Sequence, residues 1–289
     1  MQEEFDNFFP FIDAHFHVTP RKYLPPGLNL NIEEEKNFVP LTAFEEPESL
    51  LEYMDKNHIK KLWIINYVSD VHKISFDINE WSTEYCSYDK KRLIPFGSIN
   101  IASSKTPYKD MERLRDLGIR GIKIHGPHMW IDPAAHLNNG PGKEQLEATY
   151  SMSEKWGWPV MFHTGTSIVP LARSRFGNPL SIEDVAVSYP NLKIILSHAG
   201  RPLWGKEAAF VLRRFENVYL DVSSIPPKLF EKYVIDYKKY WDKMIFGSDF
   251  PGFGAKPPLE NAIWYAKTPI LPPEIKLKLL RENAEKLIF

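Results

Sequence analysis

Short apolar segments alternate along the chain with amphipathic ones. Segments rich in apolar and β-branched residues predict strands at 11–17, 61–67, 93–99, 121–125, 159–163, 192–198, 218–222 and 244–249. Apolar residues recur at helical spacing near 48–57, 77–88, 108–117, 144–156, 182–189, 206–215 and 228–241, and in two segments from about 259 to 287. This order, strand then helix throughout, indicates a parallel sheet with crossover helices.

Eight such strands are the number that closes the commonest α/β barrel, so the sequence predicts one (β/α)8 barrel over residues 1–289. The alternative, an open doubly wound sheet, usually has a glycine-rich phosphate-binding turn after its first strand. Asp-Ala-His-Phe-His stands there instead, at 13–17. Residues 19–47 are rich in proline and too long for a passive connection, so we expect an inserted lid or substrate loop.

Charge and cysteine content exclude several classes of function. Lys and Arg total 36 against 37 for Asp and Glu, and this balance gives no basic excess to bind nucleic acid. Cys86 is the single cysteine, so neither an intrachain disulfide nor a cysteine-based zinc site can form. The acidic start lacks signal-peptide features, and no apolar run reaches the roughly 18 residues of a membrane span. A cytoplasmic location is therefore expected.

Polar residues gather at the C-terminal ends of the predicted strands, where barrel enzymes build their active sites. Side chains alternate across a strand, which predicts that His15 and His17 face the barrel axis together with Asp13. The same alternation predicts that Ile12 and Ala14, like residue 16, face the surrounding helices. Two imidazoles on one strand end can bind a single cation from the same side.

Three later strands end in the same way, at His163, His198 and Asp249. A buried carboxylate such as that of Asp249 is costly to ionise unless a cation neutralises it. Three imidazoles and one carboxylate form an ordinary ligand set for zinc, with manganese, iron and cobalt as alternatives. Any one of these residues could be a buried core residue whose hydrogen bonds are satisfied within the protein. That explanation accounts poorly for four polar groups at four strand ends.

In these motifs the sequence resembles the amidohydrolase superfamily, specifically the amidohydrolase-related branch that includes aminocarboxymuconate-semialdehyde decarboxylase and aromatic-acid decarboxylases. The resemblance is carried in order by residues 13–17, 121–125, 163–165, 189–200, 217–223, 247–251 and 282–284. It implies that His15, His17, His163 and Asp249 hold a single divalent metal ion. It also implies that His198 acts as general acid/base beside a metal-bound water. A further hypothesis is that Asp249 both binds the metal and accepts a proton from this water.

Lys123 and His125 share the inward face of the fourth predicted strand. In two-metal members of the superfamily, a lysine on this strand is carboxylated and bridges the metals. In the branch resembled here one metal is the rule, so Lys123 is expected to contact substrate. A structural pair between Lys123 and Asp13 is a further alternative, and His125 is expected either to contact substrate or to hold a loop.

Arginines after the strands are candidates for binding a substrate carboxylate, because a guanidinium fork matches it. Arg201 is best placed, three residues beyond His198, and Arg173 and Arg175 follow His163. Trp130, together with His128, follows the fourth strand and is expected to wall an aromatic pocket. The expected partners are a small anionic substrate and, in a homodimer or larger homo-oligomer, further copies of the chain.

Three functions stay open on these grounds. The first is hydrolysis of a small carboxylate-bearing or cyclic molecule by metal-activated water. The second is decarboxylation or hydration of an aromatic or unsaturated acid at the same site, since fold and ligand set do not decide the reaction. The third is a catalytically silent scaffold that binds metal only for structure. A structural metal site normally has all its coordination positions filled by protein ligands, so this third function fits the present site less well.

Overall fold

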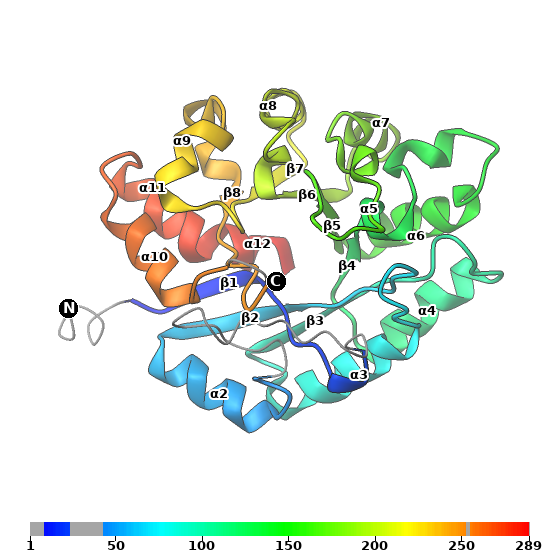
Figure 1. Cartoon of the computed structure of the whole chain (residues 1–289), viewed down its shortest axis with the longest axis horizontal. Coiled ribbons are helices and arrows are strands. Elements are labelled where there is room, and N and C mark those ends of the chain that lie inside the picture. Colours follow the sequence, from blue (N-terminus) through cyan, green and yellow to red (C-terminus); the bar gives the residue numbers. More distant parts are fainter. Residues whose placement is uncertain (1–8, 24–42, 253–254, 289) are drawn as a thin grey trace.

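The strands follow one another in sequence order around a barrel. A computed structural model of the chain describes residues 9–23, 43–252 and 255–288. Within them, eight parallel strands pair each with the next: β1 (Phe11–Phe16), β2 (Ile59–Ile65), β3 (Leu93–Gly97), β4 (Gly121–Ile124), β5 (Pro159–His163), β6 (Lys193–Ser197), β7 (Val218–Asp221) and β8 (Met244–Ile245). They form a nearly closed (β/α)8 barrel, which confirms the predicted fold (Figure 1).

Helices surround the strands in the same order (Figure 1). They are α2 (Pro47–Lys56), α3 (Asp77–Cys86), α4 (Pro107–Leu117), α5 (Gly126–Met129), α6 (Lys143–Trp156), α7 (Ser181–Ser188), α8 (Gly205–Arg214), α9 (Phe230–Tyr233), α10 (Pro258–Lys267), α11 (Pro273–Leu277) and α12 (Asn283–Ile288). None of the helices in the described ranges has the length and apolar character needed to cross a membrane.

Two predicted segments need comment. The single helix expected near 228–241 is wrong: α9 is followed by the short 3-10 turn η7 (Tyr237–Lys239), because Asp236 has a φ of 53°, which an α-helix excludes. Of the predicted loop 19–47, residues 21–23 form the 3-10 turn η1 (Arg21–Tyr23) and α2 begins at Pro47, whereas 24–42 lie outside the described residues.

Alternate residues of the strands pack into two separate layers. The outer layer, which includes Leu62, Ile122 and Leu196, packs against the helices. The barrel interior is a smaller apolar cluster, and α12 contributes to it. Its buried members are Ile12, Ala14, Trp63, Ile65, Ile94, Phe96, Met161, Ile195, Ile245, Ala284 and Leu287. The polar side chains of the candidate site lie beyond this apolar interior, toward the C-terminal ends of the strands.

The first strand departs from strict alternation. Its register against β2 shifts between Asp13 and Phe16, so that two residues, Ala14 and His15, span one position of the partner strand. An irregularity of this bulge type re-aims the side chains that follow it. The prediction that Ile12 and Ala14 face the helices is wrong, since both pack in the barrel interior, whereas Phe16, which follows the shift, lies in the outer layer as predicted.

A buried carboxylate joins β1 to the segment that follows β8. Asp13 Oδ1 accepts hydrogen bonds from the backbone N–H groups of His15 (3.0 Å) and Ser248 (2.9 Å), and Oδ2 accepts one from the Ser248 hydroxyl (2.5 Å). Burial raises the pKa of Asp13 to about 7, although these hydrogen bonds oppose the shift. Backbone bonds extend the same seam, from Ala14 N to Phe246 O at 2.9 Å and from His17 N to Phe250 O at 2.9 Å.

Removing the Ser248 hydroxyl should weaken this seam. Ser248→Ala leaves a buried Asp13 oxygen without its hydroxyl donor, and we expect the free energy of unfolding to fall by about 1–3 kcal/mol. Urea denaturation followed by circular dichroism measures it. The exposed Ser103→Ala is the control and should change little. Equal stability of the two variants would contradict the role given to the seam.

Candidate metal centre and active site

A cavity of about 560 Å³ lies at the C-terminal ends of the strands. Its walls come from the segments after seven of the eight strands, which is the usual place of a barrel active site. The polar side chains that line it are His15, His17, Tyr67, His72, Lys123, His125, His128, His163, Ser167, His198, Arg201, Ser224 and Asp249, with others. Most of the predicted site residues are therefore brought together.

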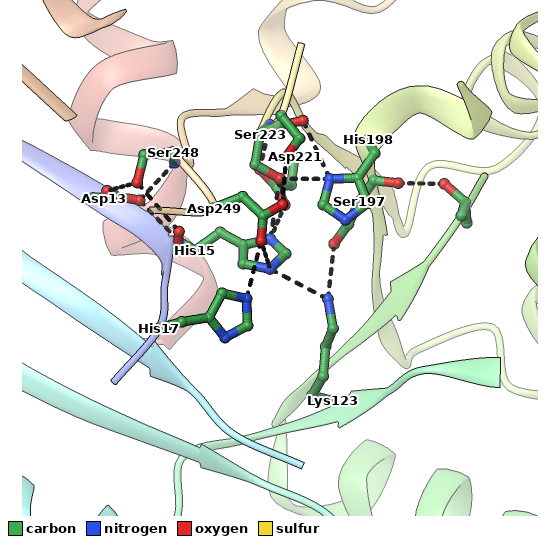
Figure 2. A network of polar contacts seen from close by, with 12 residues as sticks. Asp13, His15, His17, Lys123, Ser197, His198, Asp221, Ser223, Ser248 and Asp249 are labelled. Atoms are coloured by element: carbon green, nitrogen blue, oxygen red, sulfur yellow. Dashed lines mark hydrogen bonds and ion pairs between the residues drawn. The ribbon is translucent and has the colours of Figure 1, made fainter. Parts of the chain in front are cut away.

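A tight group of metal-ligating atoms lies at one end of this cavity (Figure 2). Ligand atoms of His15, His198 and Asp249 all lie within 4.8 Å of one another. One oxygen, Asp249 Oδ1, is 3.4 Å from His15 Nε2 and 3.0 Å from His17 Nε2. The other, Oδ2, accepts a hydrogen bond from the Ser224 hydroxyl. The carboxylate is thus held with Oδ1 toward the two imidazoles of the first strand.

Asp221, at the end of β7, orients His15 from behind. His15 Nδ1 lies 2.5 Å from Asp221 Oδ2, so this nitrogen donates and Nε2 keeps its lone pair. Ser223 supports the carboxylate with its backbone N–H (2.8 Å) and its hydroxyl (2.7 Å). The packing is tight there, because a Cβ at Gly247 would meet Asp221 Oδ1 at 2.5 Å.

Neighbouring groups determine the hydrogen positions of His198 in the same way. Its Nδ1 lies 3.2 Å from the carbonyl oxygen of Ser223 and 2.9 Å from the hydroxyl of that residue. A carbonyl oxygen only accepts, so Nδ1 donates and Nε2 is the unprotonated nitrogen. The buried His198 side chain therefore has the form that a proton acceptor or a metal ligand requires.

His163 lies slightly apart from the tight group. Its ring stacks on that of His125 with centroids 3.9 Å apart, and its centroid is 4.8 Å from that of His198. Its Nε2 lies 3.3 Å from the carbonyl oxygen of Thr166, which leaves Nδ1 with the free lone pair. His163 thus borders the cavity beside His198, and its role as a ligand stays a prediction.

Burial controls the charge of these groups. It lowers the pKa of His15, and it lowers the pKa of His163 and His198 well below the ordinary value, so these imidazoles are neutral near pH 7. Burial alone would raise the pKa of Asp249, but the adjacent imidazoles outweigh it and hold this pKa well below its usual range. Neutral imidazoles around an ionised carboxylate are the forms in which these groups bind metal.

Two cationic side chains face the same cavity. Burial lowers the pKa of Lys123 to about 8; its Nζ lies 3.5 Å from His15 Nε2 and 3.4 Å from the Ser197 hydroxyl. The alternative in which Lys123 pairs with Asp13 is wrong, because Asp13 binds Ser248 instead. Arg201 is mostly buried, and no carboxylate of the described residues lies within ion-pairing distance of it.

The remaining predicted substrate contacts divide into two groups. His125 lines the cavity, buried between the rings of His128 and His163. Trp130 and Arg173 are not among the residues that line it. They contact each other, with the guanidinium carbon 4.8 Å from the ring centroid of the tryptophan. Their role in substrate binding stays a prediction from the sequence.

Sequence reasoning missed three residues with a place in this site. Asp221 stands at the end of a strand after an apolar run, as Asp249 does, but no role was predicted for it from the sequence. Ser223, two residues further on, had no distinguishing signal. Tyr67 also lines the cavity; it stands at the end of the predicted second strand, and only the fold shows that this position faces the histidines.

The donor set fits a divalent cation. His15, His17 and Asp249 converge on one point, and the Nε2 of His15 is left unprotonated toward it by Asp221. Imidazole held by a carboxylate is the usual support of a metal ligand. His163 and His198 border the same region with neutral rings.

Comparison with known proteins identifies the class of this protein. The family model described as Amidohydrolase matches residues 12–289, so the chain belongs to the amidohydrolase family and is an enzyme of that superfamily. This confirms the resemblance inferred from the motifs. A comparison with curated protein sequences gives no match.

Solved structures share the fold along nearly the whole chain. An uncharacterised TIM-barrel protein from Bordetella bronchiseptica is 24% identical, with a TM-score of 0.71 and coverage of 96% of this chain and 98% of that one. A probable 2-pyrone-4,6-dicarboxylic acid hydrolase from Acinetobacter baumannii with bound citric acid is 15% identical (TM-score 0.68, coverage 97% and 99%). A 5-carboxyvanillate decarboxylase from Novosphingobium aromaticivorans, complexed with manganese and a nitrobenzoic acid, is also 15% identical (TM-score 0.66, coverage 97% and 96%).

Metal analysis tests the centre directly. We expect about one equivalent of divalent metal per chain after dialysis, measured by plasma mass spectrometry, and loss of most of it in His15→Ala and Asp249→Ala. His136→Gln, a buried histidine outside the cavity lining, should keep the metal. Two equivalents would instead indicate a carboxylated Lys123 bridging two ions. Retention of metal in both ligand variants would contradict the assignment.

We expect Asp221 to affect metal affinity although it is not itself a metal ligand. Asp221→Asn weakens the bond that orients His15, and we expect the affinity for Zn²⁺ to fall about 10- to 100-fold. Competition with a chromophoric chelator measures this affinity. An unchanged Kd for Zn²⁺ would show that His15 does not depend on Asp221 for its orientation.

Proposed function

We propose that this chain, acting as one barrel domain over residues 1–289, is a metal-dependent hydrolase of a small carboxylate-bearing or cyclic organic substrate. In this proposal His15, His17, His163 and Asp249 hold one divalent ion, with zinc as the first candidate and manganese, iron or cobalt as alternatives. The observation that carries it is the group of His15, His198 and Asp249, whose ligand atoms lie within 4.8 Å of one another and in which His198 keeps an unprotonated Nε2.

The cation, when bound, supplies a Lewis acid that polarises a carbonyl group and brings the pKa of water near neutrality. The residues of the chain supply the rest. His198 accepts a proton at Nε2 while Ser223 holds its Nδ1–H, and it returns that proton to the leaving group. The Ser224 hydroxyl holds Oδ2 of Asp249, so Oδ1 stays directed toward the imidazoles of His15 and His17.

Two cations favour an anionic substrate. Arg201 lines the cavity without a carboxylate partner in the described ranges, and a buried guanidinium without one is costly. A substrate carboxylate is the matching group, because it accepts two parallel hydrogen bonds from this side chain. The buried Lys123 adds positive charge beside His15, where a second anionic or carbonyl oxygen of the substrate is favoured.

Decarboxylation is the second candidate function, because the fold is equally compatible with it. The structural neighbours include both a hydrolase and a decarboxylase at nearly equal TM-scores, so the fold alone suits either reaction. The same arginine that binds a carboxylate for positioning can hold an acid whose carboxyl group is lost.

Replacing His198 separates catalysis from metal binding. We expect His198→Ala to lose at least about 100-fold in kcat, because the proton acceptor is gone, while metal content stays near one equivalent. Turnover is followed on a panel of lactones, esters and amides by pH-stat, and on aromatic and unsaturated acids by release of carbon dioxide.

The outcomes of this experiment differ clearly. Loss of metal in His198→Ala would make His198 a ligand and contradict its assignment as a base. Turnover confined to the acid panel would replace hydrolysis by decarboxylation. Failure of the metal-loaded enzyme on both panels would leave the inactive scaffold as the better description.

A further inference from the structure

A second polar cluster lies in the cavity outside the proposed metal centre. It consists of Tyr67 after β2, His128 in α5 and Ser167 after β5, and all three line the cavity. The Tyr67 hydroxyl is 2.9 Å from His128 Nδ1, and His128 Nε2 is 2.8 Å from the Ser167 hydroxyl. The proposed reaction gives these residues no task.

The hydrogen bonds of this cluster leave one hydrogen over. Val169 N also donates to the Ser167 hydroxyl oxygen at 3.2 Å, which makes three hydrogen-bond contacts in the cluster. Four hydrogens are available for them: those of the Tyr67 and Ser167 hydroxyls, of the neutral His128 ring and of the Val169 amide. If Ser167 donates to His128 Nε2, then His128 Nδ1 carries a hydrogen and donates to Tyr67. Ser167 then accepts one bond and donates one, and the hydrogen left over is the phenolic one of Tyr67; in the opposite arrangement Tyr67 donates to His128, and the hydrogen left over is the hydroxyl one of Ser167.

Ring contacts place Tyr67 next to the reaction site. Its ring stacks on that of His125, with centroids 5.2 Å apart, and His125 in turn stacks on His163 at 3.9 Å. His125 also stacks on His128, with centroids 3.5 Å apart and planes 9° apart. The tyrosine is thus fixed by packing on one side and by a hydrogen bond at its tip, which orients its hydroxyl before substrate arrives.

The charge states agree with this arrangement. Burial, together with the nearby Asp249, raises the pKa of Tyr67, so the phenol keeps its hydrogen. Burial lowers the pKa of His128 to about 3, so this imidazole is neutral and bears a hydrogen on one nitrogen only.

We propose that Tyr67 is a substrate-binding residue, which donates its phenolic hydrogen to an oxygen of the substrate, with His128 and Ser167 as positioning residues. The substrate is then a carboxylic acid with a second oxygen, a carbonyl, ring or hydroxyl oxygen, set apart from the carboxylate that Arg201 binds. This inference rests on the proposed function for its anionic group but adds a second point of recognition.

Binding of simple acids to the metal-loaded enzyme tests the inference. The probes are benzoate and 2-, 3- and 4-hydroxybenzoate, which carry one carboxylate and, except for benzoate, an oxygen at a varied position. We expect one isomer to bind more tightly than benzoate in titration calorimetry. Tyr67→Phe should weaken the binding of that isomer by roughly 3- to 10-fold and the binding of benzoate by less than about 2-fold.

Two controls accompany this measurement. Tyr88→Phe removes an exposed phenol and should change no affinity. Arg201→Gln should weaken all four acids alike, because each has the same carboxylate. Equal effects of Tyr67→Phe on benzoate and on every isomer, or no effect on any, would overturn the inference and leave the proposed function standing. Failure of all four acids to bind the unaltered enzyme would count against the anion site of the proposed function as well.

Nitrogen NMR of the histidine side chains gives a readout that needs no ligand. With ¹⁵N-labelled histidine, and His128→Gln to assign the signals, we expect His128 to carry its hydrogen on Nδ1. Tyr67→Phe should shift the Nδ1 signal, and Tyr88→Phe should not. A hydrogen on Nε2 would mean that Tyr67 donates to His128 and has none for the substrate, which overturns the inference even if acids bind.

Discussion

The closure of the barrel between its first and last strands is the constraint on which the site depends. His17 and Asp249 are 232 positions apart in the chain, yet His17 Nε2 and Asp249 Oδ1 lie 3.0 Å apart. Backbone bonds such as Asp249 N to His15 O (2.7 Å) and the buried Asp13 carboxylate hold the two edges together. The two ends of the strand order meet at this seam, so the proposed metal site depends on its formation.

Burial gives the site its chemical character. It disfavours the charged forms of His15 and His198 and so lowers the pKa of both, whereas interactions with the neighbouring histidines outweigh burial at Asp249 and hold its pKa well below the usual range. Carbonyl and carboxylate partners then decide which ring nitrogen keeps its lone pair, as Ser223 does for His198. The protein thus presents the unprotonated Nε2 of His15 toward Asp249 Oδ1 at 3.4 Å, an arrangement that a divalent cation stabilises.

Much of the fold and of the candidate site could be predicted from the sequence, and the predictions that failed did so for physical reasons. Strand and helix periodicity predicted the barrel, and polar residues at strand ends predicted that His15, His17 and Asp249 lie together. Periodicity assumes unbroken alternation, so it missed the register shift between Asp13 and Phe16, which leaves Ala14 in the barrel interior and Phe16 in the outer layer. It also missed the break at Asp236, since a left-handed residue other than glycine leaves no mark in an apolar pattern. Partners from distant strands, such as Asp221, become visible only once the fold brings them together.

A metal centre of this kind does not select its substrate, because its ligands contact only the reacting atoms. In the function proposed for this barrel, selection falls to side chains that line the cavity from other strands: Arg201 after β6, Tyr67 after β2 and His128 after β4. They are fixed by different means, Tyr67 and His128 by ring stacking and hydrogen bonds and Arg201 by burial. Rigid donors at separate places admit only a molecule whose acceptors match their spacing, because each unmatched buried donor costs free energy. Related barrels can therefore keep the centre and change the substrate by altering these strand ends alone.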